Sequence, residues 1–286
     1  YNDERVIKTR YADYPWSDRQ HPNTTDVIEL STNTIPNIIH FVFALKPQTE
    51  PFLFIYYISI FSAYIINKPE HIYLYYHYDM NGKWFDKLKE DVPVLEFVKI
   101  DIPTHIGDKP IKHVAHMADK VRMEKLINHV DIDMDMDTIS VRPYKHLLNN
   151  KVVLGKEKGD YGICNAIMMS IPNSEFFTLW WNEYEKSFKP DGWGEASILL
   201  PKTLANQNPD LLTLLEPSVF FLPNYDETHK IFRKKTKRIP KELITLHLWE
   251  QKSMKYIQKI NDWDWAGKKN KIHQGRMLLH LKNKIL

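Results

Sequence analysis

The sequence is short of cysteine, glycine and net charge, and each shortage excludes a class of protein. Cys164 is the single cysteine among 286 residues, so the chain forms no internal disulfide and no Cys-x-x-Cys zinc or redox site. The 9 glycines are too few to favour a glycine-rich phosphate loop as the chemical centre. With 39 Lys and Arg against 36 Asp and Glu, the net charge is +3, and we expect no nucleic-acid partner.

The sequence also lacks an apolar run long enough to cross a bilayer. The longest run, from Phe52 to Ile66, falls short of the about 20 residues that a spanning helix needs, and we interpret it as a buried helix. The single cysteine favours the reducing cytoplasm. Because the chain begins at Tyr1 rather than Met, an upstream signal or anchor would not be visible, and a Golgi or membrane-anchored location stays open.

What is present is the composition of a folded domain. The chain is 43% hydrophobic and 26% charged, which is ordinary for a globular protein, and it is long enough to bury a large core. Residues 1–34 are polar and predict a surface arm or stem. Residues 35–286 predict one domain with a helical elaboration from about residue 190 onward.

Apolar periodicity divides this domain into alternating strands and helices. The predicted strands cover 36–43, 71–78, 94–101, 130–141, 151–155 and 161–171, and the predicted helices cover 51–67, 112–129, 176–187 and 195–205. Strands that alternate with helices are typical of an α/β sandwich built on a mostly parallel sheet. The sequence therefore predicts that fold class.

Aspartates alternate with apolar residues in Asp131-Ile-Asp-Met-Asp-Met-Asp137. As one strand, this stretch would place all its carboxylates on one face, with neighbours about 7 Å apart. Each neighbouring pair then repels by about 2 kcal/mol at an effective dielectric constant of about 20. Either the carboxylates hold a hard cation such as Mg²⁺, Mn²⁺ or Ca²⁺, or the strand is a solvated edge with its Ile and Met side chains inward.

Known carboxylate motifs narrow the first alternative. An EF-hand loop counted from Asp131 requires Gly and Glu where Met136 and Arg142 stand, so it fails. A phosphatase of the haloacid-dehalogenase type requires Asp-x-Asp-x-Thr or Val, whereas Thr138 directly follows Asp137. An Asp-x-Asp pair at a strand end, holding a divalent ion on a nucleotide diphosphate, fits without adjustment.

A charged pair lies shortly before the acidic stretch. Asp119 and Arg122 are spaced i and i+3 on the predicted helix 112–129, so they share one flank of it. In isolation such a pair is usually a surface ion pair worth a few tenths of a kcal/mol. Its place directly upstream of the aspartates favours a shared site instead.

These segments resemble glycosyltransferase family 32, sugar-binding Asp-x-Asp enzymes related to the clostridial toxin glucosyltransferases. The resemblance is carried by 115–124 (AHMADKVRME), 134–138 (MDMDT) and 141–143 (VRP). It extends to the segments 35–40 (IPNIIH), 162–166 (GICNA) and 246–249 (LHLW). The chain departs from the family where Val130-Asp131 replace Gly-Gly and where Phe43 replaces a usual Trp.

The resemblance implies a GT-A fold, a Rossmann-like α/β/α sandwich that binds a nucleotide sugar at the carboxyl ends of its strands. It implies that Asp135 and Asp137 hold Mn²⁺ or Mg²⁺, with His247 as a candidate third ligand. It also implies an aromatic base site along His40, Phe41, Val42 and Phe43.

The same resemblance assigns roles in the reaction. Asp119, Arg122 and Asn165 are the implied catalytic residues, and Asp119, Arg122 and Asp135 are implied to contact the nucleotide sugar. The implied reaction is metal-dependent transfer of a hexose, with retention of configuration, from a UDP-hexose to a glycan or other hydroxyl acceptor. GDP-mannose-dependent mannosyl transfer, a metal-dependent phosphohydrolase and a weakened nucleotide-sugar or glycan-binding module are the alternatives.

Three further features have both a functional and an ordinary interpretation. His113 and His116 have a metal-compatible spacing, but packing or solvent exposure explains them better because no third ligand stands nearby. The segment 192–197 (GWGEAS) either covers the donor or acceptor or simply begins a helix. The basic segment 229–241 is either a solvated loop or a surface for anionic ligands and peripheral membrane contact.

Overall fold

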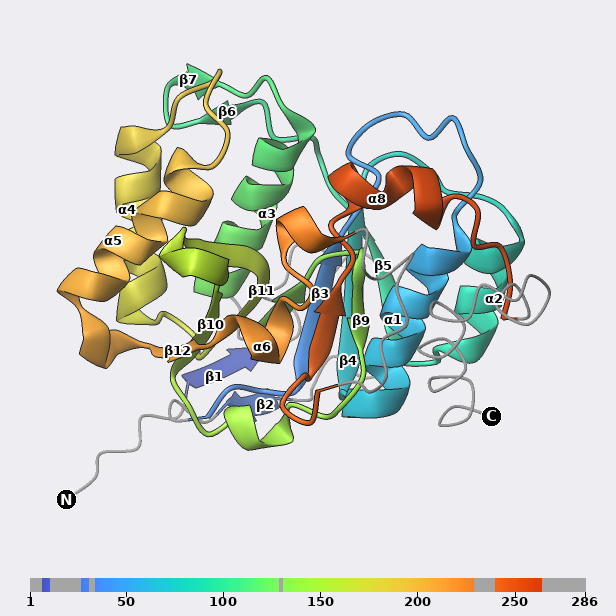
Figure 1. Cartoon of the computed structure of the whole chain (residues 1–286), viewed down its shortest axis with the longest axis horizontal. Coiled ribbons are helices and arrows are strands. Elements are labelled where there is room, and N and C mark those ends of the chain that lie inside the picture. The colour runs from blue at the N-terminus through green and yellow to red at the C-terminus, as the bar shows by residue number, and fades with distance from the viewer. Residues whose placement is uncertain (1–6, 11–26, 31–33, 129–130, 229–239, 264–286) are drawn as a thin grey trace.

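The computed structural model describes residues 7–10, 27–30, 34–128, 131–228 and 240–263 (Figure 1). Within the predicted N-terminal arm, the strands β1 (Ile7–Arg10) and β2 (Val27–Leu30) pair in antiparallel fashion. The rest of that arm, except Thr34, and most of the basic segment 229–241 lie outside the described residues. The predicted membrane contact through 229–241 therefore stays a prediction.

A seven-stranded sheet forms the centre of the fold. Its strands, in spatial order, are β12 (Thr213–Leu215), β10 (Val152–Lys156), β11 (Ile163–Ser170), β8 (Asp131–Met134), β3 (Ile38–Val42), β4 (His71–Tyr76) and β5 (Leu95–Lys99). Only β11 runs antiparallel to its neighbours, and the other pairings are parallel. The predicted α/β class with a mostly parallel sheet is confirmed.

Helices cover both faces of this sheet because successive side chains of its central strands point to opposite sides. On β3, Ile39 and Phe41 join the core beneath α1 (Phe54–Asn67), while Ile38 and Val42 join the core beneath α3 (Val114–Asn128). Figure 1 shows the corresponding layers, with α1 and α2 (Lys83–Asp91) on one side and α3, α4 (Glu175–Ser187) and α5 (Leu200–Gln207) on the other. The expected α/β/α sandwich, with helices on both faces of a mostly parallel sheet, is therefore present.

The expected elaboration after about residue 190 is present in the described residues. It comprises a π-helical turn at Glu195–Leu199, α5, α6 (Pro217–Phe220), the strand β13 (Thr245–His247) and α8 (Glu250–Ile257). Two short strands, β6 (His105–Ile106) and β7 (Lys109–Pro110), form a hairpin before α3. No helix of the described residues is long and apolar enough to span a membrane.

The acidic stretch is not the continuous strand that the alternation predicts. β8 ends at Met134, a turn follows at Met136 and Asp137, and β9 (Thr138–Ser140) pairs with β13 instead of continuing in the large sheet. The backbone carbonyl of Asp135 closes the turn by accepting hydrogen bonds from the backbone N–H (3.1 Å) and the hydroxyl (2.7 Å) of Thr138. The prediction of one shared carboxylate face across 131–137 is therefore wrong, because the turn re-aims Asp137.

Candidate functional site

A cavity of about 1060 Å³ opens where several strands of the large sheet end. Its walls come from the residues that follow β3, β8 and β10, from α3, and from the β13–α8 segment. The carboxyl ends of parallel strands are the usual ligand sites of open α/β sheets. The fold therefore places most of the sequence-predicted site residues around this one cavity.

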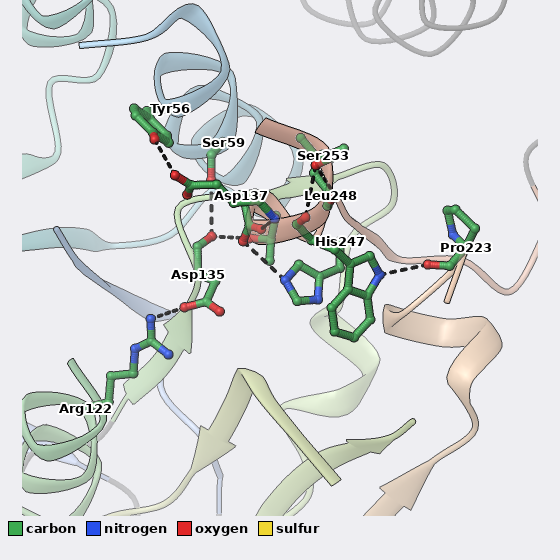
Figure 2. A network of polar contacts seen from close by, with 12 residues as sticks. Tyr56, Ser59, Arg122, Asp135, Asp137, Pro223, His247, Leu248 and Ser253 are labelled. Carbon is green, nitrogen blue, oxygen red and sulfur yellow. Dashed lines mark hydrogen bonds and ion pairs between the residues drawn. The ribbon is translucent and has the colours of Figure 1, made fainter. Parts of the chain in front are cut away.

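Two aspartates and a histidine meet in this cavity (Figure 2). Asp135, Asp137 and His247 each offer one ligand atom, and these atoms lie within 4.8 Å of one another. The antiparallel pairing of β13 with β9 sets His247 opposite Thr138, beside the aspartate turn. The backbone N–H of Leu248 donates to the carbonyl of Asp137 at 2.9 Å and holds the two segments in register.

The donor set fits a hard or borderline divalent ion. Two carboxylates and an imidazole suit Mn²⁺ or Mg²⁺. One ring nitrogen of His247, Nδ1, is buried and has no hydrogen-bond partner within the described part of the chain. Nδ1 of His247 is thus a buried polar atom without a partner among the described residues, and it lies next to the carboxylates of Asp135 and Asp137, which repel one another. A divalent ion would satisfy this site.

Asp137 is held as a carboxylate by its neighbours. Its Oδ1 lies 3.2 Å from Nε2 of His247, and its Oδ2 accepts a hydrogen bond of 2.6 Å from the backbone N–H of Glu250. Burial acts to raise the pKa of Asp137, but the charge and hydrogen bond of His247 outweigh it and lower that pKa. Burial likewise acts to lower the pKa of His247, and Asp137 outweighs it and raises that pKa.

Asp135 faces the opposite wall, where it forms an ion pair with Arg122. Burial raises the pKa of Asp135 to about 6, although the guanidinium of Arg122 opposes the rise. Nε of the same arginine lies 3.5 Å from Oδ2 of Asp133, which is 1% exposed. The buried guanidinium of Arg122 therefore compensates the carboxylates of both Asp133 and Asp135. Arg122, one member of the charged pair predicted on α3, is thus part of the site.

Asp119 and Asn165 form the third part of the site. Nδ2 of Asn165 donates to Oδ1 of Asp119 at 2.7 Å, and the hydroxyl of Tyr184 donates to its Oδ2 at 2.9 Å. Burial raises the pKa of Asp119, and the charge of Arg122 and both hydrogen bonds oppose that rise. Asp119 and Asn165 line the cavity, so a fixed carboxylate with remaining lone pairs faces any ligand there.

The predicted base site is divided by the geometry of β3. Val42 and Phe43, at and just after the end of the strand, line the cavity. His40 and Phe41 do not line it: Phe41 is fully buried in the core beneath α1, and the ring of His40 lies between those of Tyr73 and Tyr75. Because both faces of β3 are covered by helices, only the residues at its carboxyl end reach the cavity.

Several cavity residues were not predicted from the sequence. Glu250 accepts a hydrogen bond of 2.8 Å from the hydroxyl of Tyr56, and burial, followed by the charge of Asp137, raises its pKa to about 7. Trp249 packs its ring 4.0 Å from that of His247 and donates from Nε1 to the carbonyl of Pro223. The late His-x-Trp pattern was a signal for Trp249, whereas nothing in the sequence near Glu250 indicated its place.

Comparison with known proteins gives one match among curated sequences at high significance. The chain is 31% identical over 246 residues to Glucan organizing enzyme 1 of Cryptococcus neoformans var. grubii serotype A. The alignment covers 79% of this chain and 66% of that protein, so the chain spans slightly less than two thirds of its relative. No family model matches the chain.

Solved structures that are similar to the chain include several glycosyltransferases. The glycosyltransferase GlyE of Streptococcus pneumoniae TIGR4 is 14% identical with a TM-score of 0.49, over 88% of this chain and 64% of that one. Mouse xyloside xylosyltransferase 1 is 11% identical with a TM-score of 0.43, over 73% of this chain and 96% of that one. These values are too low to assign an activity, which has to be inferred from the site itself.

Proposed function

We propose that the chain is a family 32-like glycosyltransferase with the GT-A fold, and that it catalyses metal-dependent, retaining hexosyl transfer. The donor in this proposal is a UDP-hexose, and the acceptor is a glycan or another hydroxyl compound. The observation that carries it is the meeting of Asp135, Asp137 and His247 in the same cavity as Asp119 and Asn165. A site for a divalent ion thus lies beside hydrogen-bonding groups suited to sugar hydroxyls.

Asp135, Asp137 and His247 would hold the ion. When bound, Mn²⁺ or Mg²⁺ supplies charge that stabilises the leaving nucleoside diphosphate. Arg122 contributes a second, permanent positive charge, which its ion pair with Asp135 keeps at the cavity wall. The protein's own role at this end of the cavity is to fix these charges before the donor arrives.

Asp119 would accept hydrogen bonds from hydroxyl groups of the donor sugar. Asn165 and Tyr184 hold its carboxylate from two sides, so its orientation does not depend on the ligand. Such a fixed acceptor distinguishes a sugar that offers hydroxyls in the right place from one that does not. Val42 and Phe43 would border the nucleoside base.

Retention of configuration is proposed because the aspartates at the centre are already engaged. Asp119 binds Asn165 and Tyr184, Asp135 pairs with Arg122, and Asp137 binds His247 and the backbone of Glu250. We therefore assign to none of these three aspartates the role of nucleophile or general base. In the proposed reaction, the leaving phosphate oxygen takes the proton of the acceptor hydroxyl as the new glycosidic bond forms on the same face.

The test is hydrolysis of a donor panel with Mn²⁺ or with a chelator. The panel contains UDP-glucose, UDP-galactose, UDP-N-acetylglucosamine and GDP-mannose, with UDP-glucose first because the curated relative is named for glucan. We expect slow, Mn²⁺-dependent cleavage of one donor and a loss of at least about a hundredfold in Asp137→Asn, the range that one lost charge-stabilising group typically costs.

Asp108→Asn is the matched control, because Asp108 is an exposed aspartate on the β6–β7 turn, outside the cavity. It should cleave the donor at the parental rate. Cleavage that survives chelation and the Asp137→Asn change would show that the three residues hold no catalytic ion. Release of phosphate from simple phosphomonoesters, with no response to any nucleotide sugar, would favour a phosphohydrolase instead.

A further inference from the structure

Exposed large apolar side chains gather around the cavity. Among the described residues, those side chains are Val114 (39% exposed), Tyr161 (57%), Trp193 (51%), Leu199 (38%) and Tyr225 (37%). Tyr161, Trp193 and Tyr225 line the cavity, while Val114 and Leu199 each directly neighbour a lining residue in the chain. Exposed aromatic side chains concentrated on one hollow usually mark a binding site.

Trp193 is held in its exposed position by contacts that do not bury it. Its backbone N–H donates to Oε2 of Glu195 at 2.7 Å, and its ring meets the edge of the His113 ring at 5.9 Å. Two residues before it, Asp191 accepts hydrogen bonds of 2.7 and 2.8 Å from Nζ of Lys112, which lies just before α3. The tryptophan is thus fixed in place with half of its surface open.

Tyr161 is fixed in a similar way on the hairpin between β10 and β11. Asp160 forms an ion pair of 2.9 Å with Lys202 of α5. On the other side, Gly162 packs so closely that a Cβ there would lie 2.8 Å from the carbonyl oxygen of Ile198. Because Ile198 belongs to the π-helical turn that follows Trp193, the two aromatic residues stand on segments packed tightly together.

The charges around these rings indicate what kind of ligand they suit. The cavity is lined by six carboxylates, on Asp119, Asp135, Asp137, Glu157, Asp226 and Glu250, against the permanent cations Arg122 and Lys158. Away from Arg122 and the ion site, which serve the diphosphate of the donor, this excess of carboxylates repels an acceptor that is itself negatively charged. Pyranose rings carry C–H faces that stack on the negative face of an aromatic ring, and their hydroxyls donate to carboxylates.

We propose that Trp193 and Tyr161 form a platform for the acceptor, and that the acceptor is a neutral glycan chain of several sugar units. This inference rests on the proposed glycosyl transfer and names its acceptor class. The unit that receives the hexose lies at the donor end of the cavity, while units farther along the chain stack on the platform. A single sugar or a small alcohol does not reach it.

The test measures binding and transfer separately. Isothermal titration of the protein uses neutral disaccharides and hexasaccharides of glucose, mannose and galactose, together with a hexasaccharide of uronic acid. We expect one neutral hexasaccharide to bind about tenfold more tightly than its disaccharide. Trp193→Ala and Tyr161→Ala should remove that advantage, and Trp193→Phe should keep part of it.

Leu199→Ala is the matched control, since Leu199 is exposed on the same segment but does not line the cavity. Because the side chains of Trp193 and Tyr161 are half exposed, each variant should fold, which its melting temperature checks. KM for the hexasaccharide acceptor should rise about tenfold in Trp193→Ala and Tyr161→Ala. In Leu199→Ala, both this KM and the hydrolysis of the donor without acceptor should stay unchanged.

Equal affinity for disaccharide and hexasaccharide, no binding of any neutral glycan, preference for the uronic acid chain, or full binding by both alanine variants would overturn the platform. Such a result with donor hydrolysis intact overturns the acceptor class and leaves the proposed transfer standing. Absence of metal-dependent donor hydrolysis in the parent protein overturns the proposed transfer instead. The two failures are therefore distinguishable.

Discussion

At the scale of single residues, the site depends on buried charges that compensate one another. Arg122 is 8% exposed and lies among Asp119, Asp133 and Asp135. Burial raises the pKa of Asp133 to about 8 and that of Asp135 to about 6 in spite of this arginine. Removing one member of such a group leaves its partners buried and uncompensated, which costs more than the pair contributed.

Tyr184 provides a test of how Asp119 is held. Tyr184→Phe removes the 2.9 Å hydrogen bond to Asp119 and keeps the ring in its buried place in α4. We expect a loss of about 1 kcal/mol in the free energy of unfolding and weaker donor binding, because the carboxylate is then fixed from one side only. Urea denaturation gives the first quantity, and KM for the donor gives the second.

The control for this prediction lies on the other side of the sheet. Tyr57 donates a hydrogen bond of 2.7 Å to Asp91 and lies outside the cavity. Tyr57→Phe should cost a similar free energy of unfolding and leave KM for the donor unchanged. Equal changes of KM in both variants would mean that Tyr184 acts only through stability.

The sequence predicted which side chains share a cavity better than it predicted their contacts. Asp119, Arg122, Asp135, Asp137, Asn165 and His247, which were predicted from residue type and spacing, all line the cavity. The contact of Glu250 with Asp137 joins segments 113 residues apart in the chain. No local periodicity encodes such contacts. His40 and Phe41 were predicted to line the base site but do not reach the cavity. The packing of helices on both faces of β3 decides this, and the local sequence does not show it.

At the scale of elements, segments with a clear apolar pattern were predicted, and segments with little such pattern were missed. The helix predicted at 51–67 appears as α1, and the strand predicted at 161–171 appears as β11. α2 was missed because it buries only Leu88, which leaves little apolar pattern. The turn after β8 was missed because Asp and Met continue to alternate through it, and a hydrogen bond of Thr138, rather than hydropathy, ends the strand.

The pairing of β4 with β5 supplies a prediction about pH. Nδ1 of His71 lies 3.4 Å from Oε1 of Glu96 across these strands, and this hydrogen bond, against some loss from burial, raises the pKa of His71 above its ordinary 6.5. A raised pKa in the folded state means that the contribution is complete below pH 6.5 and is lost as the pH rises through the folded value. Both side chains are about one third exposed, so we expect only a few tenths of a kcal/mol.

Urea denaturation between about pH 5.5 and pH 8.5 measures this contribution, with Glu96→Gln as the comparison. The parent protein should lose stability relative to the variant as the pH rises. Parallel curves for the two proteins over that range would show that the β4–β5 contact does not couple to the protonation of His71.

At the scale of the whole molecule, the proposed ion site joins segments that are far apart in the chain. Asp135 and Asp137 follow β8 in the centre of the sheet, while His247 ends β13 and directly precedes the segment that begins α8. The protein's own groups hold this junction through the pairing of β13 with β9 and through the hydrogen bonds that Leu248 and Glu250 donate to Asp137. An ion held by both segments would therefore close a long loop of the folded chain. The free energy of binding the ion would then also stabilise the contact between these two segments.

This coupling predicts how Mn²⁺ changes the protein as a whole. At a hundred times its dissociation constant, the ion should add about 2.7 kcal/mol to the free energy of unfolding. Hydrogen exchange should slow most in β13 and α8, because their local opening releases His247 from the ion. The measurement is amide exchange with Mn²⁺ and with chelator, where Asp137→Asn should show no difference. A uniform slowing across all strands, or an equal effect in that variant, would place the bound ion elsewhere. Slowing confined to β13 and α8 would instead show that the C-terminal segment is held to the sheet through the same carboxylates that the reaction requires.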